Sequence, residues 1–393
     1  MDYSIQHFKV FYKFFLQLNL LRIFSHTTIK HIFSIVLAAL SDSYSGKVIN
    51  FARYSSQHRT TIAHFLNHGT WDSLHFQQIL KDSVVKTIYQ EALSSGKPIF
   101  CIVDDTISSK TKPSSHALHP IEDAYFHQSH LKKKQDYGHQ AIAVMLSCNG
   151  LVLNYDIILY NKSQSKIDLV RKVAEELPVA PVISYLLCDS WYTNDKIFNA
   201  FIQKGFYSIS ALKVNRIIYP YEKRMQVQEY ASLFKKPGKH FYLVTVGNRD
   251  YYVSLYEGRL NSIENAIVLI CYPKEHFGNK ATLKAFLCTD VSLSLEEILS
   301  IYTERWSIEI FFRDTKGKLA LDQYQIRSSQ GIQRYWMLMS FVHFLCCTGT
   351  GKNVDFQTGR SILQREIQRK EIEFFLICGQ KGMTTDEVLK LVG

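Results

Sequence analysis

The stretch Ile99-Phe100-Cys101-Ile102-Val103-Asp104-Asp105-Thr106 decides the expected fold of this chain. Its first five residues form an unbroken apolar run of strand length, which is typical of a buried central β-strand. Two carboxylates follow this run directly. Because functional side chains of α/β proteins gather where the strands of the sheet end, the same stretch marks a candidate site.

The segments after this strand alternate between strand and helix patterns. Asn149-Gly150, a strong hairpin signal, separates two of the apolar segments. The expected elements are strands at 139–148, 151–160, 183–188 and 206–212 and helices at 165–177 and 194–203. This order predicts a mixed sheet covered by helices, and it matches the order of the RNase-H-like fold.

Residues 1–95 are expected to be helical, since apolar residues recur there at three- and four-residue spacing and no proline interrupts them. Residues 48–52 and 59–66 suggest two helices joined by a polar turn, which suits a helix-turn-helix. The second helix would present four residues to DNA: Arg59, Thr60, Thr61 and His64. The alternative is a helical hairpin that only packs against the rest of the chain.

Residues 213–290 break the alternation of strands and helices. They contain four successive strand patterns, at 240–247, 250–256, 265–272 and 282–288. These patterns predict a β-rich insertion. Helix patterns return at 294–318, 331–347 and 359–376, and Ser294 and Glu297 open the first of them with the spacing of a capping box.

The chain is therefore expected to be an α/β protein in five parts. No internal repeat and no low-complexity tract occurs. The parts are a helical N-terminal DNA-binding domain (1–95), the first part of an RNase-H-like catalytic core (96–212), the β-strand insertion (213–290), the second part of the core (291–350) and a helical C-terminal region (351–393).

Composition and charge narrow the class of protein. Hydrophobic residues make up 46% of the chain and charged residues 21%, as in ordinary globular proteins. The net charge of +11 favours nucleic acid as a partner, although a basic solvated surface without a partner would give the same value.

Cysteine usage and hydropathy indicate where the protein works. The eight cysteines form no C-x-x-C pair and lie mostly in apolar runs, which indicates core residues in a reducing compartment and argues against a zinc site. Charged residues interrupt the apolar N-terminus before it reaches membrane-spanning length, and no signal peptide is evident. We therefore expect a cytoplasmic protein with no membrane contact.

Asp105 and Asp189 each follow an expected buried strand, so both carboxylates should emerge at one edge of the sheet. Hard divalent cations prefer carboxylate oxygens, and two acids at this edge could share such ions. In the alternative interpretation each aspartate only caps the turn after its strand.

The expected helix at 294–318 carries a polar face with a third acid. Four of its residues lie within about 60° of one another at 100° per residue: Tyr302, Arg305, Glu309 and Lys316. An adjacent apolar stripe would dock the helix on the sheet: Ile301, Ile308, Phe312 and Leu319. Glu304 and Asp314 are expected to point elsewhere.

Three acids brought together in this way could catalyse phosphoryl transfer. Asp105, Asp189 and Glu309 could hold two Mg²⁺ or Mn²⁺ ions, one activating the attacking oxygen and the other stabilising the leaving oxygen. Basic and hydroxyl groups on the same helix face would hold the phosphates. The alternative is a surface helix in which Glu309 pairs with Arg305 and Arg313.

The spacing Tyr302-x2-Arg305-x3-Glu309-x6-Lys316 resembles the signature of a large branch of bacterial insertion-sequence transposases of the DDE type. Asp105, directly before Thr106, and Asp189 resemble the two catalytic aspartates of that branch. Alternation is expected to send Asp104 to the opposite face of the sheet. The roughly 120 residues between Asp189 and Glu309 match the family's β-strand insertion.

The resemblance implies a cut-and-paste enzyme that cleaves terminal inverted repeats and transfers the strands into target DNA. It implies a homodimer in a synaptic complex on double-stranded DNA and two Mg²⁺ or Mn²⁺ ions per site. The expected DNA contacts are Tyr302, Arg305, Lys316, Arg313, Arg59 and Lys110. Two alternatives stay open: an RNase-H-like nuclease or domesticated descendant without transposition, and a DNA-binding protein without enzymatic activity.

The tryptophans depart from the pattern of hairpin-forming relatives, which place one in the insertion to stack on a flipped base. This chain has its four at positions 71, 191, 306 and 336, all outside the insertion. Either Phe286 or a tyrosine takes that role, or the hairpin route is not used.

Several histidines lie in the polar stretch between the first two strands: His116, His119, His127 and His130. Their spacing is irregular and the segment is polar. We therefore expect a DNA-facing or disordered loop there rather than a metal site.

Overall fold

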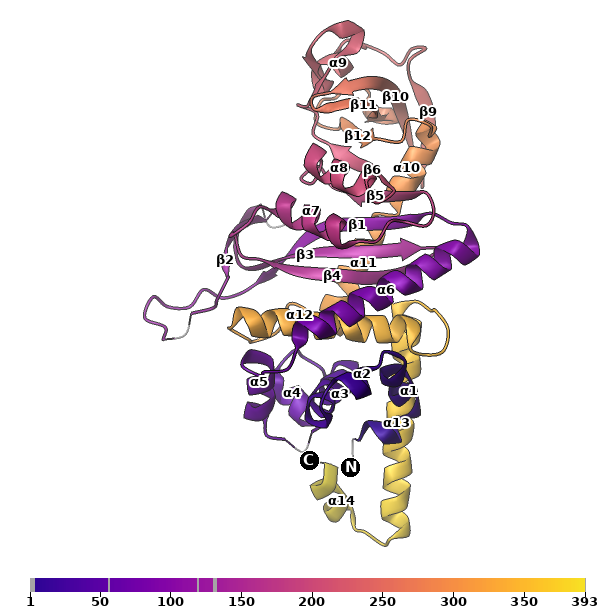
Figure 1. Cartoon of the computed structure of the whole chain (residues 1–393). Helices are drawn as coiled ribbons and strands as arrows, with labels where there is room; N and C mark the ends of the chain where they lie inside the picture. Colours follow the sequence, from indigo (N-terminus) through magenta and orange to yellow (C-terminus); the bar gives the residue numbers. More distant parts are fainter. Residues whose placement is uncertain (1–3, 56, 119, 130–132, 393) are drawn as a thin grey trace.

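The computed structural model describes the whole chain except residues 1–3, 56, 119, 130–132 and 393. The molecule is elongated (Figure 1). The helices near the two chain ends lie at one end of it, a mixed sheet lies in the middle, and the β-rich segment lies at the other end.

Five strands form the centre of the sheet in the order β4-β3-β1-β5-β6. Their bounds are Ile99–Ser109 for β1, Lys134–Cys148 for β3, Leu151–Tyr160 for β4, Ser184–Cys188 for β5 and Phe206–Leu212 for β6. Strands β1, β5 and β6 run parallel, whereas β3 runs antiparallel to both of its neighbours. The mixed sheet expected from the sequence is therefore present.

The hairpin between β3 and β4 has the predicted two-residue turn. Asn149 and Gly150 have φ angles of 50° and 81°, and asparagine and glycine adopt such positive values at little cost. Cys148 pairs with Leu151 across the turn. The turn therefore sets the register in which the two strands begin to pair.

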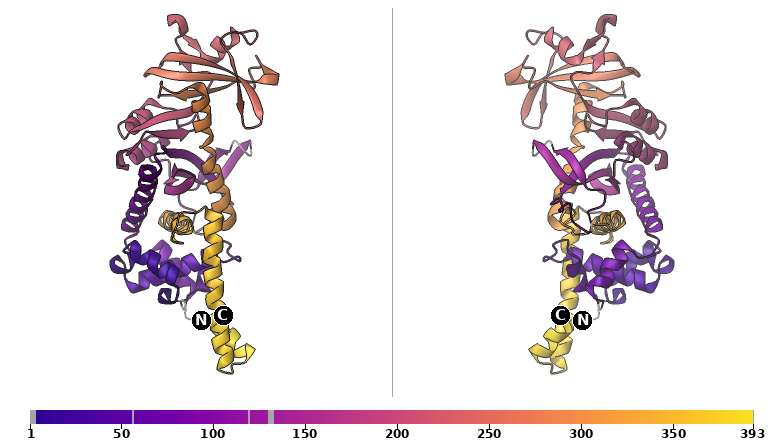
Figure 2. Two further views of the ribbon diagram at one scale, coloured as in Figure 1. Left: turned by 90° about the vertical axis from the view of Figure 1, so that its right-hand side faces the viewer. Right: turned by 90° about the vertical axis from the view of Figure 1, so that its left-hand side faces the viewer.

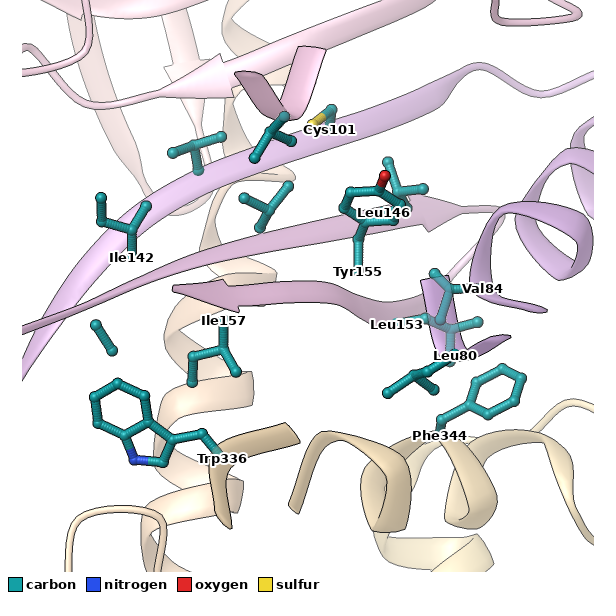
Figure 3. Packing of buried hydrophobic residues seen from close by; sticks show 14 of the residues in the cluster. Leu80, Val84, Cys101, Ile142, Leu146, Leu153, Tyr155, Ile157, Trp336 and Phe344 are labelled. Carbon is teal, nitrogen blue, oxygen red and sulfur yellow. The ribbon is translucent and has the colours of Figure 1, made fainter. Parts of the chain in front are cut away.

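Strand alternation divides the apolar side chains of β1 between two cores. Ile99, Cys101 and Val103 lie in the larger core. Among the helices that contribute to it are α6 (Ser73–Ser95), α7 (Lys166–Glu176), α8 (Asp195–Ile202) and α12 (Ser329–Thr348). Figure 3 shows the part of this core where Leu80 of α6 and Phe344 of α12 pack beneath the sheet.

Phe100 and Ile102 lie in the smaller core on the other face. Two helices close this face: α10 (Leu295–Thr303) and α11 (Trp306–Lys318). Ser294 and Glu297 form the predicted capping box at the start of α10. The two faces of the hydrophobic run in β1 therefore pack against two different helix layers.

Helix α12 is buried on almost every side, because it lies between the sheet and the N-terminal helices (Figure 1). Those helices are α1 (Lys9–Gln17), α2 (Leu20–Ile23), α3 (His26–Leu40), α4 (Val48–Ala52) and α5 (Arg59–Asn67), after a short 3-10 turn at Ile5–His7. Arg334 of α12 donates hydrogen bonds to the carbonyls of Phe65 and Leu66. These bonds tie the N-terminal helices to the rest of the molecule.

The C-terminal region is helical, as expected. It consists of α13 (Phe356–Gln380) and α14 (Thr385–Val392). Figure 2 shows α13 running beside the N-terminal helices and extending past them. Contacts of α13 with α12 and α3 fix its first half.

The expected β-rich segment is present, and its strands extend the central sheet. Its elements are β7 (Ile217–Ile218), β8 (Met225–Gln226), α9 (Val227–Ser232), β9 (Tyr242–Val246), β10 (Arg249–Leu260), β11 (Ile263–Pro273) and β12 (Lys284–Cys288), with 3-10 turns at Pro220–Glu222 and Lys274–His276. Strand β12 pairs antiparallel with β6, so the sheet continues through β12, β11 and β10 to β9.

Three elements differ from the sequence-based expectation. The first strand continues from Val103 to Ser109, because its polar half still pairs with β3. A further strand, β2 (Tyr125–Ser129), pairs with the start of β3 inside the stretch expected to be a loop. The helix expected at 294–318 is divided into α10 and α11.

The histidine-rich stretch is only partly a loop. His127 lies on β2 and is buried, so the expectation of a loop is wrong there, whereas His116 is exposed. His119 and His130 lie outside the described residues. Within the described part of the chain, no three His, Cys, Asp or Glu side chains are placed to hold a metal ion.

The cysteines and the membrane-spanning potential agree with the sequence analysis. All eight cysteines are buried, and none of them forms a disulfide in the part of the chain that the structure describes. Among the described helices, none combines the length and the apolar character that crossing a bilayer requires.

Gly359 provides a test of the contact between α12 and α13. A Cβ atom at this position would collide with the backbone carbonyl of Cys346, whereas a Cβ at Gly379 of the same helix would meet no atom within 4 Å. We expect Gly359→Ala to lower the thermal unfolding midpoint by several degrees, since overpacking costs about 1–3 kcal/mol. The matched control Gly379→Ala should keep or raise the midpoint. Equal midpoints for the two variants would contradict this helix contact.

Candidate active site

The parallel pairing of β1 with β5 places two acids side by side. The last paired residues are Val103 and Cys188, and Asp104 and Asp189 come next in the two segments. Both acids continue the alternation of Ile102 and Leu187, which lie in the smaller core. The two carboxylates therefore project toward the face that α10 and α11 cover.

Asp105 projects to the opposite face, which reverses the orientation expected from the sequence. Its carboxylate accepts hydrogen bonds from Lys166 Nζ (2.7 Å), Tyr192 Oη (2.9 Å) and Gln140 Nε2 (2.7 Å). Lys166 is the first residue of α7, in the layer of the larger core. The expectation that Asp105 faces α10 and α11 is therefore wrong, and Asp104 holds that position.

The junction of α10 and α11 is a shallow break. Glu304 and Arg305, which separate the two helices, both keep right-handed helical backbone angles. The residues on either side therefore stay on one face, as their spacing predicted. The expected apolar stripe is present in part: Ile308 and Phe312 are buried in the smaller core and Ile301 packs against it, whereas Leu319 lies in the larger core.

Three residues of the helical polar face contact the middle of β1 and the end of β5. Arg305 Nη1 donates to Asp104 Oδ2 at 2.8 Å, and Lys316 Nζ donates to Thr106 Oγ1 at 2.6 Å. Tyr302 Oη donates to the carbonyl of Cys188 at 3.4 Å. The polar face is thus directed at the strand ends, as the sequence predicted.

Glu309 is linked to Asp104 through a shared guanidinium. Arg305 Nη2 lies 3.7 Å from Glu309 Oε1, while Nη1 of the same side chain pairs with Asp104. The Glu309 side chain remains 41% exposed. Glu304, expected to point elsewhere, is exposed. The cluster of Asp104, Asp189, Arg305 and Glu309 is called the acid site below.

Burial raises the pKa of Asp104 to about 7; the Arg305 guanidinium opposes this shift and the Asp189 carboxylate adds to it. Neighbouring carboxylates repel one another, so their ionised forms need a positive charge nearby. Arg305 supplies that charge in this structure. Three carboxylates are also the kind of donor set that Mg²⁺ or Mn²⁺ prefers.

The comparison with protein families agrees with this geometry. The family model described as the transposase DDE domain matches residues 95–345, which is more than half of the chain. The chain belongs to this family. The match includes every residue of the acid site and leaves out α1 to α5 and α13. No curated protein compared with this transposase-family chain matches it in sequence.

The other expected DNA contacts of this transposase-family chain differ in exposure. Arg313 of α11 has a 72% exposed side chain, and Arg59 at the start of α5 is exposed. Lys110 instead donates hydrogen bonds to the carbonyls of Asp322 (2.7 Å) and Tyr324 (2.9 Å). Burial lowers the pKa of Lys110 to about 8. Its ammonium group ties the segment between α11 and α12 to the end of β1.

Lys110 is therefore expected to contribute to stability rather than to DNA affinity. Replacing it with methionine leaves two carbonyls without their donor, a loss of about 1–3 kcal/mol, so the thermal midpoint should fall. The salt dependence of DNA binding should not change. Lys112→Met, at an exposed lysine two residues away, should leave the midpoint unchanged. An unchanged midpoint for Lys110→Met together with a weaker salt dependence would instead identify Lys110 as a DNA contact.

Proposed function

We propose that this chain is a transposase that cleaves DNA at the ends of a mobile element and joins the freed ends to target DNA. The observation that carries the proposal is the acid site, in which Asp104 and Asp189 lie side by side and Arg305 links Asp104 to Glu309. The family match supports it. The strand order β4-β3-β1-β5-β6, with β3 alone antiparallel, supports an RNase-H-like core.

We assign the first catalytic acid to Asp104 rather than to Asp105. Asp104 shares its face with Asp189, Arg305 and α11. Asp105 is occupied on the other face by an ion pair with Lys166, whose side chain is largely buried. A carboxylate held by three hydrogen-bond donors in that layer could reach the acid site only if β1 turned over, which would break its pairing with β3.

Asp104, Asp189 and Glu309 do not form a ready ligand set among the described residues, because the Arg305 guanidinium lies between Asp104 and Glu309. The three acids would hold the divalent metal ions once that guanidinium moves aside. When bound, two Mg²⁺ or Mn²⁺ ions would activate the attacking water or 3′-hydroxyl and stabilise the leaving oxygen. The chain's own basic groups would bind the DNA backbone beside the acids, above all Lys316 and the exposed Arg313. Tyr302, a partly buried residue of α10 whose hydroxyl donates to the carbonyl of Cys188, would position the helix face against β5.

The N-terminal helices would bind the element ends. Helices α4 and α5 are present at the positions expected for a helix-turn-helix, and the side of α5 expected to face DNA is exposed: Arg59, Thr60, Thr61 and His64. The excess of positive charge favours this partner. We further propose that two copies act together as a homodimer on a pair of terminal inverted repeats.

The acid site predicts which substitutions abolish cleavage. Asp104→Asn, Asp189→Asn and Glu309→Gln should each slow Mg²⁺-dependent nicking of an end-containing duplex by more than about 100-fold, because each removes a metal ligand. Binding of the same duplex should be largely retained. The duplex is taken from the inverted repeats that flank the gene, and nicking is followed on a denaturing gel.

Two neighbouring acids serve as matched controls for these variants. Glu304→Gln should cleave at the wild-type rate, and Asp105→Asn should keep measurable activity, because Gln140 and Tyr192 still have a polar group to contact. If Asp105→Asn were inactive at an unchanged thermal midpoint while Asp104→Asn cleaved normally, the assignment of the first acid would be reversed.

Arg59 predicts a separate effect on affinity. Arg59→Ala should weaken binding of the element end and lower the slope of log affinity against log salt by about one, since one phosphate contact is lost. The cleavage rate at saturating protein should stay close to that of the wild type. The exposed Arg22 on α2, outside the proposed helix-turn-helix, provides the control substitution Arg22→Ala. Equal effects of the two changes would argue that only general basicity matters.

A further inference from the structure

Trp191 is an exposed tryptophan two residues after Asp189, with its ring on the Lys166 side of the sheet. It is 54% exposed, whereas the next residues, Tyr192 and Thr193, are 1% and 4% exposed. The backbone N–H of Trp191 donates to Asp189 Oδ1 at 2.9 Å. The indole is therefore exposed to solvent one short turn away from a carboxylate of the acid site.

The turn that carries Trp191 is held firmly on both sides. Tyr192 Oη donates to Asp105 at 2.9 Å, and Thr193 Oγ1 donates to the carbonyl of Ala211 at 2.7 Å. Arg216 Nη2 donates to the carbonyl of Thr193 at 2.9 Å. The exposure of the indole is thus built into an ordered turn.

Two lysines flank the exposed ring. The Nζ atoms of Lys166 and Lys213 each lie 5.3 Å from the centroid of the Trp191 ring. Lys166 is paired with Asp105, but Lys213 is exposed, and no ion pair of its ammonium group is found among the described residues. An aromatic ring beside free positive charge is the combination with which proteins bind single-stranded nucleic acid, by stacking on bases and contacting phosphates.

We propose that Trp191 stacks on an unpaired base of the DNA strand held at the acid site, and that Lys213 contacts the backbone of that strand. The inference rests on the proposed function for the identity of the strand. Bases inside a duplex already stack on both faces, so only an unpaired base offers a free face to the indole. Phe286, the alternative suggested by the sequence, packs on Tyr302 instead, with ring centroids 4.8 Å apart.

Binding without divalent metal ions tests this inference separately from cleavage. Fluorescence anisotropy would compare a labelled single strand of about 20 nucleotides with a duplex of the same sequence. Trp191→Ala should bind the single strand roughly 5- to 100-fold more weakly and the duplex as the wild type does. Trp191→Phe should retain most of the single-strand affinity. Lys213→Ala should weaken both complexes and lower the salt slope by about one.

Tyr242 provides a matched control, since it is a 56% exposed aromatic residue on β9 at the far edge of the sheet. Tyr242→Ala should change neither affinity. The inference is overturned if Trp191→Ala binds single strands normally, or if it loses single-strand and duplex affinity equally while its thermal midpoint falls. Inactivity of Asp104→Asn would still support the proposed function in that case. A wild-type protein that binds single strands through Trp191 but never cleaves would overturn the proposed function alone.

Discussion

The register between β1 and β5 is the constraint on which the acid site depends. An apolar strand buried on both faces carries little information about its own register, because either face of Ile99–Val103 could enter either core. Two ion pairs at the end of the run remove this ambiguity. Lys166 on one face pairs with Asp105, and Arg305 on the other face pairs with Asp104. A slip of one residue would separate both pairs and leave partly buried charges without partners, which is a costly outcome.

The same arrangement makes the acid site locally unfavourable. Burial and the neighbouring Asp189 raise the pKa of Asp104 even though Arg305 lies against it, so one guanidinium does not fully compensate the buried acids. Helix α11 nevertheless stays in place, because Ile308, Phe311 and Phe312 anchor it in the smaller core independently of these charges. Apolar contacts therefore hold the helix in place. The positive charge beside the acids can then change from the Arg305 guanidinium to a metal ion without loss of the helix position. Enzymes commonly combine a stable apolar scaffold with a polar site that is locally unfavourable.

Local patterns in the sequence predicted most elements of the fold and the convergence of the helix face on the strand ends. Three of these patterns depend only on residues that are close in the sequence: the turn Asn149-Gly150, the capping box at Ser294 and the apolar run Ile99–Val103. The continuation of β1 to Ser109 was not predictable in this way, because pairing with β3 extends a strand through polar residues. The break before α11 was not predicted either, and Glu304 and Arg305 keep helical backbone angles across it.

The orientation of the aspartate pair was missed for a related reason. Side-chain alternation along β1 places Asp104 and Asp105 on opposite faces of the sheet, but it does not determine which face α11 covers. A usable signal was present in the sequence. Asp104 and Asp189 each directly follow an apolar run, and the ends of these two runs pair with each other as Val103 and Cys188. Strand-end alignment is therefore a better guide to such a pair than a match to the residue before Thr106.

The β-rich segment bears on the acid site through the position of α10. Because β12 pairs with β6, the chain leaves this segment beside the strand next to β5, and Asp290 there accepts a hydrogen bond from Tyr185 of β5 at 3.2 Å. The capping box at Ser294 starts α10 four residues later. A short segment thus connects β12 to α10 and α11, and α11 brings Glu309 to the strand acids. The length of the segment between β6 and β12 can vary without moving Glu309, provided that this last strand keeps its pairing with β6.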